Sequence, residues 1–208
     1  MSVSRTVRPF VVAAAAAAGM ATAITPTASG APGAAPEATP QDRAGTTSLG
    51  QSIVDWAYRE YNDPAHNREF PLGSNCNFYS GVMNAGAPAC GNGMQAPSWG
   101  WCANFAEYVW KNGGANTSGL NNESTSFKQY GQARGTWSNN LAAVQPGDAV
   151  LFENGRPGSP DLDHVGVAVT GWDGSGVWII EGNSHDRVYK RKVSGGNGAI
   201  GFARPVPR

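Results

Sequence analysis

The apolar residues of this sequence change their spacing once along the chain, near residue 135. In three segments before that point they recur every three or four residues, which is typical of helices that bury one face. After it they form short apolar runs separated by glycine-rich turns, which is typical of antiparallel strands. Helices followed by such strands predict an α+β fold, with N-terminal helices packed on a C-terminal antiparallel sheet.

Three segments have helical spacing. The first begins after Ser48, a residue suited to capping, and ends near Pro64 after about fourteen residues. The second carries Cys102 in its first turn and ends at Gly113, and the third is a polar helix over residues 124–134. Residues 63–98 contain turn signals without a clean period, so we expect a long ordered loop there.

Five strands are predicted, at residues 149–152, 164–170, 177–181, 187–193 and 199–203. Residues 172–176 carry a strong hairpin-turn signal, and a turn centred near residue 173 places His164 opposite residue 182. Glu181 and Asn183 flank that position and share a strand face. We therefore expect one or both of them to reach the imidazole of His164.

The N-terminal region differs in composition from the rest of the chain. Arg5 and Arg8 precede an alanine-rich apolar run too short to span a membrane, so residues 1–30 are predicted to be a secretory signal. Residues 31–46 lack any period and are predicted to be a disordered leader. One folded domain remains, residues 47–208. We expect an exported, extracellular protein without stable membrane insertion.

Charge gives little direction to the choice of partner. The chain has 15 basic and 15 acidic residues, and the predicted signal removes two of the basic ones, which leaves a net charge of about −2. No stripe or block of lysine and arginine is present. A nucleic-acid partner is therefore not expected.

Three cysteines in an exported chain cannot all pair within it. Cys76 and Cys90 lie in the loop-like segment, and a bridge between them would stabilise the domain by roughly 3 kcal/mol in the chain-entropy model. We predict this disulfide, because it leaves the helix-borne Cys102 as a free thiol. A bridge from Cys102 to either Cys76 or Cys90 stays an open alternative at this point.

The residue types at Cys102 and His164 indicate nucleophilic catalysis. A thiol at a helix N-terminus lies near unpaired backbone N–H groups and the positive end of the helix dipole, which favour thiolate. A histidine beside Glu181 or Asn183 would be held in one orientation, as in a catalytic triad. Each residue alone has an ordinary explanation, as a small core residue, a buried strand histidine or a solvated strand end. Their joint placement favours the catalytic interpretation.

Five short segments together resemble the CHAP family, the cysteine- and histidine-dependent amidohydrolases/peptidases. The resemblance covers about residues 50–206, and the order and spacing of the segments match as well as their identities. The segments are Trp101-Cys102-Ala103-Asn104-Phe105, Val144-Gln145-Pro146-Gly147-Asp148-Ala149-Val150, Asp163-His164-Val165-Gly166-Val167, Glu181-Gly182-Asn183 and Ile200-Gly201-Phe202-Ala203-Arg204-Pro205.

The resemblance implies a papain-like fold and a role for each matching residue. Cys102 resembles the family nucleophile, His164 the general base, and Glu181 with Asn183 the groups that orient the histidine. Many members have glutamine just before the cysteine, whereas this chain has Trp101, which leaves the oxyanion-hole side chain unassigned. Trp99 and Trp101 are candidates for substrate binding, by stacking on sugar or lining a peptide groove, or else close the helix start as core residues.

The function implied by the resemblance is cleavage of bacterial peptidoglycan. The candidate bonds are the N-acetylmuramoyl-L-alanine amide and peptide bonds of the stem or cross-bridge. Two other functions use the same fold: a non-catalytic secreted wall-binding module, and a thiol acyltransferase that acts on proteins. We expect a monomer that is secreted or associated with the cell wall.

No cofactor is expected, and the sequence holds no pattern for a catalytic metal such as HExxH. Asp161 and Asp163 carry oxygen ligands of the kind that calcium prefers. Acidic residues before a strand are usually solvated, however, so no metal site is predicted.

Overall fold

The computed structural model describes residues 48–83, 90, 100–153 and 163–208. The predicted signal (1–30) and leader (31–46) lie outside the described residues. The folded unit comprises residues 45–208. In the described part of the chain, no helix is both long and apolar enough to cross a membrane.

Three of the helices confirm the predictions. Helix α1 (Leu49–Asn62) begins at Ser48, whose hydroxyl accepts a hydrogen bond from the backbone N–H of Gln51. Helix α3 (Cys102–Gly113) ends where Gly114 adopts a left-handed conformation, with φ of 101°. Helix α4 (Thr125–Ala133) lies within the predicted polar segment.

Helix α2 (Phe78–Met83) corrects the prediction that residues 63–98 are loop throughout. It is six residues long and contains a glycine, so it gives no periodic signal of its own. The carboxamide of Asn77 accepts a hydrogen bond from the backbone N–H of Ser80 and caps its first turn. The neighbouring Cys76 is tied to Cys90 by a disulfide.

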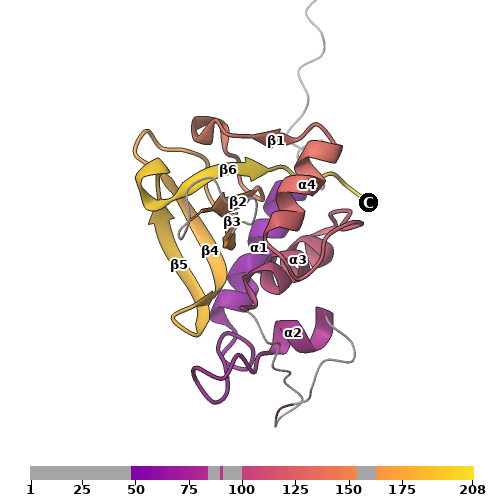
Figure 1. Cartoon of the computed structure of the whole chain (residues 1–208), viewed down its shortest axis with the longest axis vertical. Coiled ribbons are helices and arrows are strands. Elements are labelled where there is room, and N and C mark those ends of the chain that lie inside the picture. Colours follow the sequence, from indigo (N-terminus) through magenta and orange to yellow (C-terminus); the bar gives the residue numbers. More distant parts are fainter. Residues whose placement is uncertain (1–47, 84–89, 91–99, 154–162) are drawn as a thin grey trace, which may run out of the picture. The chain divides into compact units, whose positions relative to one another are not determined.

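The sheet is antiparallel, with strand order β1-β6-β2-β3-β4-β5 (Figure 1). Its strands are β1 (Trp137–Ser138), β2 (Ala149–Phe152), β3 (His164–Ala168), β4 (Val177–Ser184), β5 (Arg187–Val193) and β6 (Ala199–Ala203). Strands β2, β5 and β6 have the predicted bounds. Strand β3 is shorter than predicted, β4 is longer, and the two-residue β1 was not predicted because it is too short to carry a pattern. The α+β fold class is confirmed.

The register between β3 and β4 differs by one residue from the prediction. Gly166 pairs with Glu181 and Ala168 with Ile179, so extending the ladder places His164 opposite residue 183 rather than 182. The hairpin is closed by a hydrogen bond from Asp173 N–H to the Gly176 carbonyl, and pairing resumes between Val169 and Trp178. The segment between these two contacts is therefore two residues longer before the turn than after it, and this difference shifts the pairing of β3 with β4. The observed register places Glu181 on the same face as His164.

The main core lies between the helices and one face of the sheet. Its largest buried residues on the helix side include Trp101, Trp110, Tyr79 and Phe105, and the same cluster contains sheet residues such as Val165. A second, smaller cluster includes Val150, Phe152, Ile179 and Phe202. Helix α3 packs against both β3 and β4, and its first residue, Cys102, meets His164 at the start of β3.

Candidate active site

Cys102 is the first residue of α3 and the free cysteine of the chain. The predicted Cys76–Cys90 disulfide is confirmed, so the alternative bridges to Cys102 are excluded. The Cys102 side chain is largely buried, with 7% of the residue exposed, and its Sγ lies 3.4 Å from Ser124 Oγ. Trp101, the residue before α3, makes no capping hydrogen bond with its side chain, so the first-turn N–H groups around the thiol receive no cap from this residue.

Trp101 is fully buried, which corrects its expected role in substrate binding. Its indole N–H donates a hydrogen bond to Glu69 Oε1 at 2.7 Å, and its ring stacks on Tyr79. Of the two explanations offered for this residue, the core one holds, because a ring without exposed surface cannot stack on a sugar. Trp99 lies outside the described residues.

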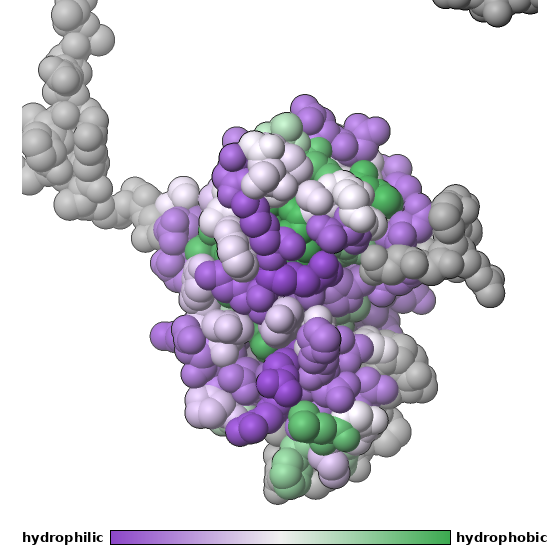
Figure 2. Space-filling view, turned by 90° about the vertical axis from the view of Figure 1, so that its left-hand side faces the viewer, coloured by the Kyte–Doolittle hydropathy of each residue, from purple (hydrophilic) through white to green (hydrophobic). Residues whose placement is uncertain are grey.

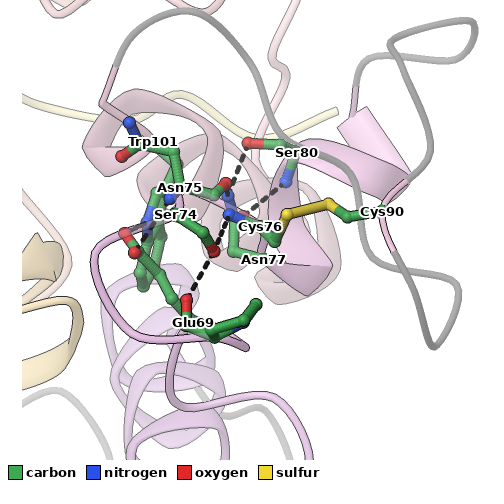
Figure 3. Close-up of a disulfide and its surroundings, with 9 residues drawn as sticks. Glu69, Ser74, Asn75, Cys76, Asn77, Ser80, Cys90 and Trp101 are labelled. Atoms are coloured by element: carbon green, nitrogen blue, oxygen red, sulfur yellow. Dashed lines mark hydrogen bonds between the residues drawn. A yellow bond between two sulfur atoms is a disulfide. The ribbon is translucent and has the colours of Figure 1, made fainter.

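The loop after α1 holds the start of α3 through Glu69 (Figure 3). Glu69 Oε2 accepts a hydrogen bond from the backbone N–H of Asn75, so both of its oxygens are used. Asn77 bonds Ser80, and Ser80 in turn accepts a hydrogen bond from Asn104 on α3. The disulfide and these polar contacts therefore fix the segment against which Trp101 and Cys102 are positioned.

His164 is the first residue of β3, and its imidazole is held by Glu181. His164 Nε2 lies 2.9 Å from Glu181 Oε2, and 15% of the imidazole side chain is exposed. The ring packs near Phe152, its partner on β2. With Nε2 engaged by Glu181, the other ring nitrogen, Nδ1, is left for Cys102.

Glu181 reaches His164 because residue 166, its partner across the ladder, is a glycine. A Cβ at Gly166 would lie 2.7 Å from Ile179 Cδ1, 3.2 Å from Glu181 Cβ and 3.5 Å from Glu181 Oε2. The missing side chain leaves space for the carboxylate to lie across β3 toward His164. Glu181 has no exposed surface.

Arg191 on β5 is a fourth member of this group that the sequence analysis missed. Its Nε donates to Glu181 Oε1 at 2.7 Å and its Nη2 to Oε2 at 3.0 Å, which is a two-pronged contact. Its guanidinium also lies over the Phe152 ring. Tyr189 pairs with Glu181 across β4 and β5, and Arg191 follows Tyr189 by two residues, so it shares the strand face of Glu181. The sequence alone shows only a basic residue on a predicted strand.

Asn183 does not hold the imidazole in this structure. It has a left-handed backbone, with φ of 58°, and lies at a register shift between β4 and β5. Its side chain packs against Gly100, and no hydrogen bond between described residues joins it to His164. The expectation that one or both residues reach the ring is therefore met by Glu181 alone, because the bulge turns Asn183 away from the regular ladder.

The electrostatics favour an ion pair between Cys102 and His164. Burial raises the pKa of the Cys102 thiol, but hydrogen bonding and positive charge from His164, together with Ser124, outweigh it and lower that pKa. Burial lowers the pKa of His164, but its hydrogen bonds to Cys102 and Glu181 raise it overall. Both shifts favour thiolate and imidazolium over the neutral forms.

The charge of Glu181 is maintained by its two cationic neighbours. Burial acts to raise the pKa of this carboxyl, but hydrogen bonds from His164 and Arg191 lower it to about 2. With thiolate and imidazolium formed, the four side chains of Cys102, His164, Glu181 and Arg191 carry no net charge. The buried site can therefore hold a thiolate without an uncompensated charge.

A possible metal-binding group among the described residues lies elsewhere, at Glu60, Asp63 and His66 near the end of α1. His66 Nδ1 is 3.1 Å from Asp63 Oδ2 and 3.5 Å from Glu60 Oε2. None of the catalytic candidates belongs to this group. Asp161 lies outside the described residues.

Comparison with known proteins identifies the domain. Residues 90–183 match the family model of the CHAP domain. The chain contains a CHAP domain. The matched CHAP segment includes Cys102, His164, Glu181 and Asn183, whereas Arg191 on β5 lies beyond its end. The matched segment is shorter than the resemblance found in the sequence, which covers about residues 50–206. The CHAP domain is of the peptidoglycan amidase and peptidase type.

Two other comparisons add little to the CHAP assignment. A solved structure titled "The crystal structure of Ly7917" is 13% identical to this chain, with a TM-score of 0.40. The alignment covers 76% of this chain and 63% of that one, so the chain spans less than two thirds of the length of its relative. No curated protein matches the sequence.

Proposed function

We propose that this protein hydrolyses amide or peptide bonds of peptidoglycan stem peptides, with Cys102 as the nucleophile. The observation that carries the proposal is the buried, charge-balanced group formed by Cys102, His164, Glu181 and Arg191 at the N-terminus of α3. Three of these residues lie in the segment that matches the CHAP domain. A thiol of lowered pKa beside an oriented histidine is the arrangement of an activated acyl-transfer nucleophile.

The proposed reaction proceeds through an acyl-enzyme. The Cys102 thiolate attacks the carbonyl carbon, and we assign the backbone N–H of Cys102 at the helix start as a donor to the developing oxyanion. His164 then gives its proton to the leaving amine, and the C–N bond breaks. A water molecule, deprotonated by His164, then attacks the thioester carbonyl. The C–S bond breaks, the acid leaves, and the thiolate–imidazolium pair is restored.

We further propose that the protein is exported and acts on the wall outside the cell. The composition of residues 1–30 supports export. The Cys76–Cys90 disulfide supports it independently, because such bonds persist in oxidising compartments. The bond cleaved is either the N-acetylmuramoyl-L-alanine amide or a peptide bond of the stem or cross-bridge.

The test is incubation of the protein without residues 1–30 with purified peptidoglycan, followed by mass spectrometry of the released fragments. New N-termini on stem alanine identify an amidase, and new termini within peptides identify an endopeptidase. The Cys102→Ala and Cys102→Ser variants should release nothing while keeping the native circular dichroism. Undiminished release by either variant would remove Cys102 from the mechanism. Release of no fragment by the unmodified protein would overturn the proposed function.

A further inference from the structure

Two arginines face each other outside the group formed by Cys102, His164, Glu181 and Arg191. Arg68, in the loop after α1, forms an antiparallel bridge with Arg187, the first residue of β5. The flanking hydrogen bonds run from Val188 N–H to the Asn67 carbonyl and from Glu69 N–H to the Asp186 carbonyl. A pair flanked in this way is the non-hydrogen-bonded type, in which opposite side chains lie closest.

Neither arginine has a carboxylate partner in the described part of the chain. The ion pairs there involve other cations, and the two oxygens of the nearby Glu69 are taken by Trp101 and Asn75. Arg187 donates from Nε to the carbonyl of His185, which orients its guanidinium. Like charges directly opposite each other on adjacent strands destabilise the pairing. No ion pair with a carboxylate among the described residues offsets this repulsion.

The arginines line a hollow of about 500 Å³ that contains no acidic residue. β5 is the last strand of the sheet and lies at the left in Figure 1. Figure 2 shows this left-hand side of the molecule, and most of the described surface there is hydrophilic. The lining is polar and aromatic, with several hydrogen-bonding groups beside the two cations. The lining residues are Tyr61, Asn62, Pro64, Asn67, Arg68, Arg187, Val188 and Tyr189.

The end of α1 also contributes to this hollow, and a helix C-terminus would by itself repel an anion. Its carbonyls are partly neutralised here. The amide of Asn62 donates to the Tyr58 carbonyl, and the amide of Asn67 donates to the Tyr61 carbonyl. The exposed arginines thus determine the sign of the charge that the hollow presents.

We propose that Arg68 and Arg187 together bind a phosphate group. Guanidinium groups match the oxygens of phosphate and carboxylate with paired hydrogen bonds. Two guanidinium groups on one side of a hollow offer more donors than the two oxygens of one carboxylate can take with good geometry. A phosphate offers more oxygens and, as a monoester, nearly two negative charges. This site requires no activity of Cys102 and extends beyond the proposed function.

The test measures binding by titration calorimetry with three probes: inorganic phosphate, glycerol 3-phosphate and poly(glycerol phosphate). At least one probe should bind the unmodified protein, and Arg68→Gln and Arg187→Gln should each weaken that binding by at least about 10-fold. The lysine variant Arg187→Lys should also weaken it, because a point charge cannot form the paired contact. Circular dichroism checks that each variant is folded.

The matched control is Lys192→Gln, which removes one charge from the same strand, where Lys192 pairs with Asp173 outside the hollow. It should leave binding within about 2-fold. Equal loss in this control, unchanged binding in the Arg68→Gln/Arg187→Gln double variant, or equal affinity for poly(L-glutamate) would overturn the phosphate site. If poly(glycerol phosphate) binds more tightly per phosphate than glycerol 3-phosphate, the natural ligand is a phosphate polymer. If the two bind equally per phosphate, the ligand is a free phosphate ester. Both results support the site.

Discussion

At the scale of single residues, the site depends on one buried carboxylate shared by two cations. Glu181 Oε2 accepts from both His164 and Arg191, while Oε1 accepts from Arg191 alone. A carboxylate buried without such partners would become protonated. Glu181 can therefore orient the imidazole and stabilise its positive charge, because His164 and Arg191 together keep the carboxylate ionised.

The first residue-scale prediction concerns the order of importance around the imidazole. His164→Ala should reduce the rate by about 10²–10⁴-fold or more, because the general base is lost. Glu181→Gln should have an intermediate effect, since it removes the charge but keeps the shape. Asn183→Ala should be mildest, because Asn183 does not contact the ring. The measurement is the initial rate on a soluble stem-peptide fragment.

The exposed Glu123→Gln is the control for loss of a carboxylate away from the site. Circular dichroism excludes unfolding in each variant. If Glu181→Gln lost no more rate than Glu123→Gln, the assignment of Glu181 would be wrong despite its contact with His164.

The second residue-scale prediction concerns pH and Arg191. The acid limb of kcat/KM reports protonation of the thiolate, and the lowered pKa of Cys102 places that limb below the range of a free thiol. The basic limb reports loss of the imidazolium proton, and the raised pKa of His164 places it above the ordinary histidine range. Removing a nearby cation raises the pKa of both groups. Arg191→Met should therefore move both limbs to higher pH.

A purely structural role for Arg191 would lower the rate at every pH without moving the limbs. Arg191→Lys, which keeps the charge but not the paired hydrogen bonds, should restore the limb positions in part. Lys192→Gln is the matched control on the same strand and should leave the profile in place. If the pH profiles of kcat/KM had their limbs at the same pH in the Arg191→Met variant and the unmodified protein, the charge balance proposed for the site would be wrong.

At the scale of elements, the site forms where the start of α3 meets β3 and β4. Gly182 is the residue that permits this approach. A Cβ there would lie 2.6 Å from Phe105 Cβ and 2.8 Å from two ring atoms of Trp101. Gly182 also lies between Glu181 and Asn183. The short distance between helix and strand therefore sets the position of Cys102 relative to Glu181.

The element-scale prediction is that Gly182→Ala lowers the free energy of unfolding by about 1–3 kcal/mol, the usual cost of overpacking a core. It should also lower the rate, because α3 must shift away from β4. Urea unfolding followed by circular dichroism measures the first effect. Gly195→Ala is the control, since its nearest neighbour would be a leucine methyl group at 3.8 Å. Equal stability of the two variants would show that the contact at Gly182 is not tight.

At the scale of the whole folded unit, distant segments are tied to both ends of α3. Near its start, the loop after α1, which the Cys76–Cys90 disulfide anchors, contributes Glu69, and Glu69 accepts a hydrogen bond from Trp101. Near its end, the C-terminal residues form an isolated bridge with Ala115, and Arg208 N–H donates to the Gly114 carbonyl. Arg204 also forms a two-pronged contact with buried Asp148, which joins two segments of the CHAP resemblance.

The prediction at this scale concerns the disulfide. Replacing Cys76 and Cys90 together by serine should lower the free energy of unfolding by roughly 3 kcal/mol. The rate should fall as well, because the loop holds Trp101 at the start of the catalytic helix. Non-reducing peptide mapping of the unmodified protein should find Cys76 linked to Cys90 and Cys102 alkylated by iodoacetamide. A disulfide that includes Cys102 in active protein would contradict both the structure and the proposed nucleophile.

The sequence by itself determined the elements whose signals are local. Helices α1, α3 and α4 and strands β2, β5 and β6 follow from apolar period, caps and turns, and β3 and β4 were predicted with other end points. Cys102 was singled out from its place at the start of α3, and His164 and Glu181 from their places on β3 and β4. Such signals depend on neighbours within a few residues, so they can be read without the fold. The pairing of Cys76 with Cys90 was also predictable, because it spares the helix-borne thiol.

The tertiary structure alone decided how these elements meet. The register of β3 and β4 depends on two extra residues before the turn, and the bulge after Glu181 turns Asn183 away. Arg191 belongs to the site only because β5 pairs with β4. The burial of Trp101 depends on Glu69 and Tyr79, which lie more than twenty residues away in sequence. Each of these facts rests on contacts between distant segments, which local spacing does not encode.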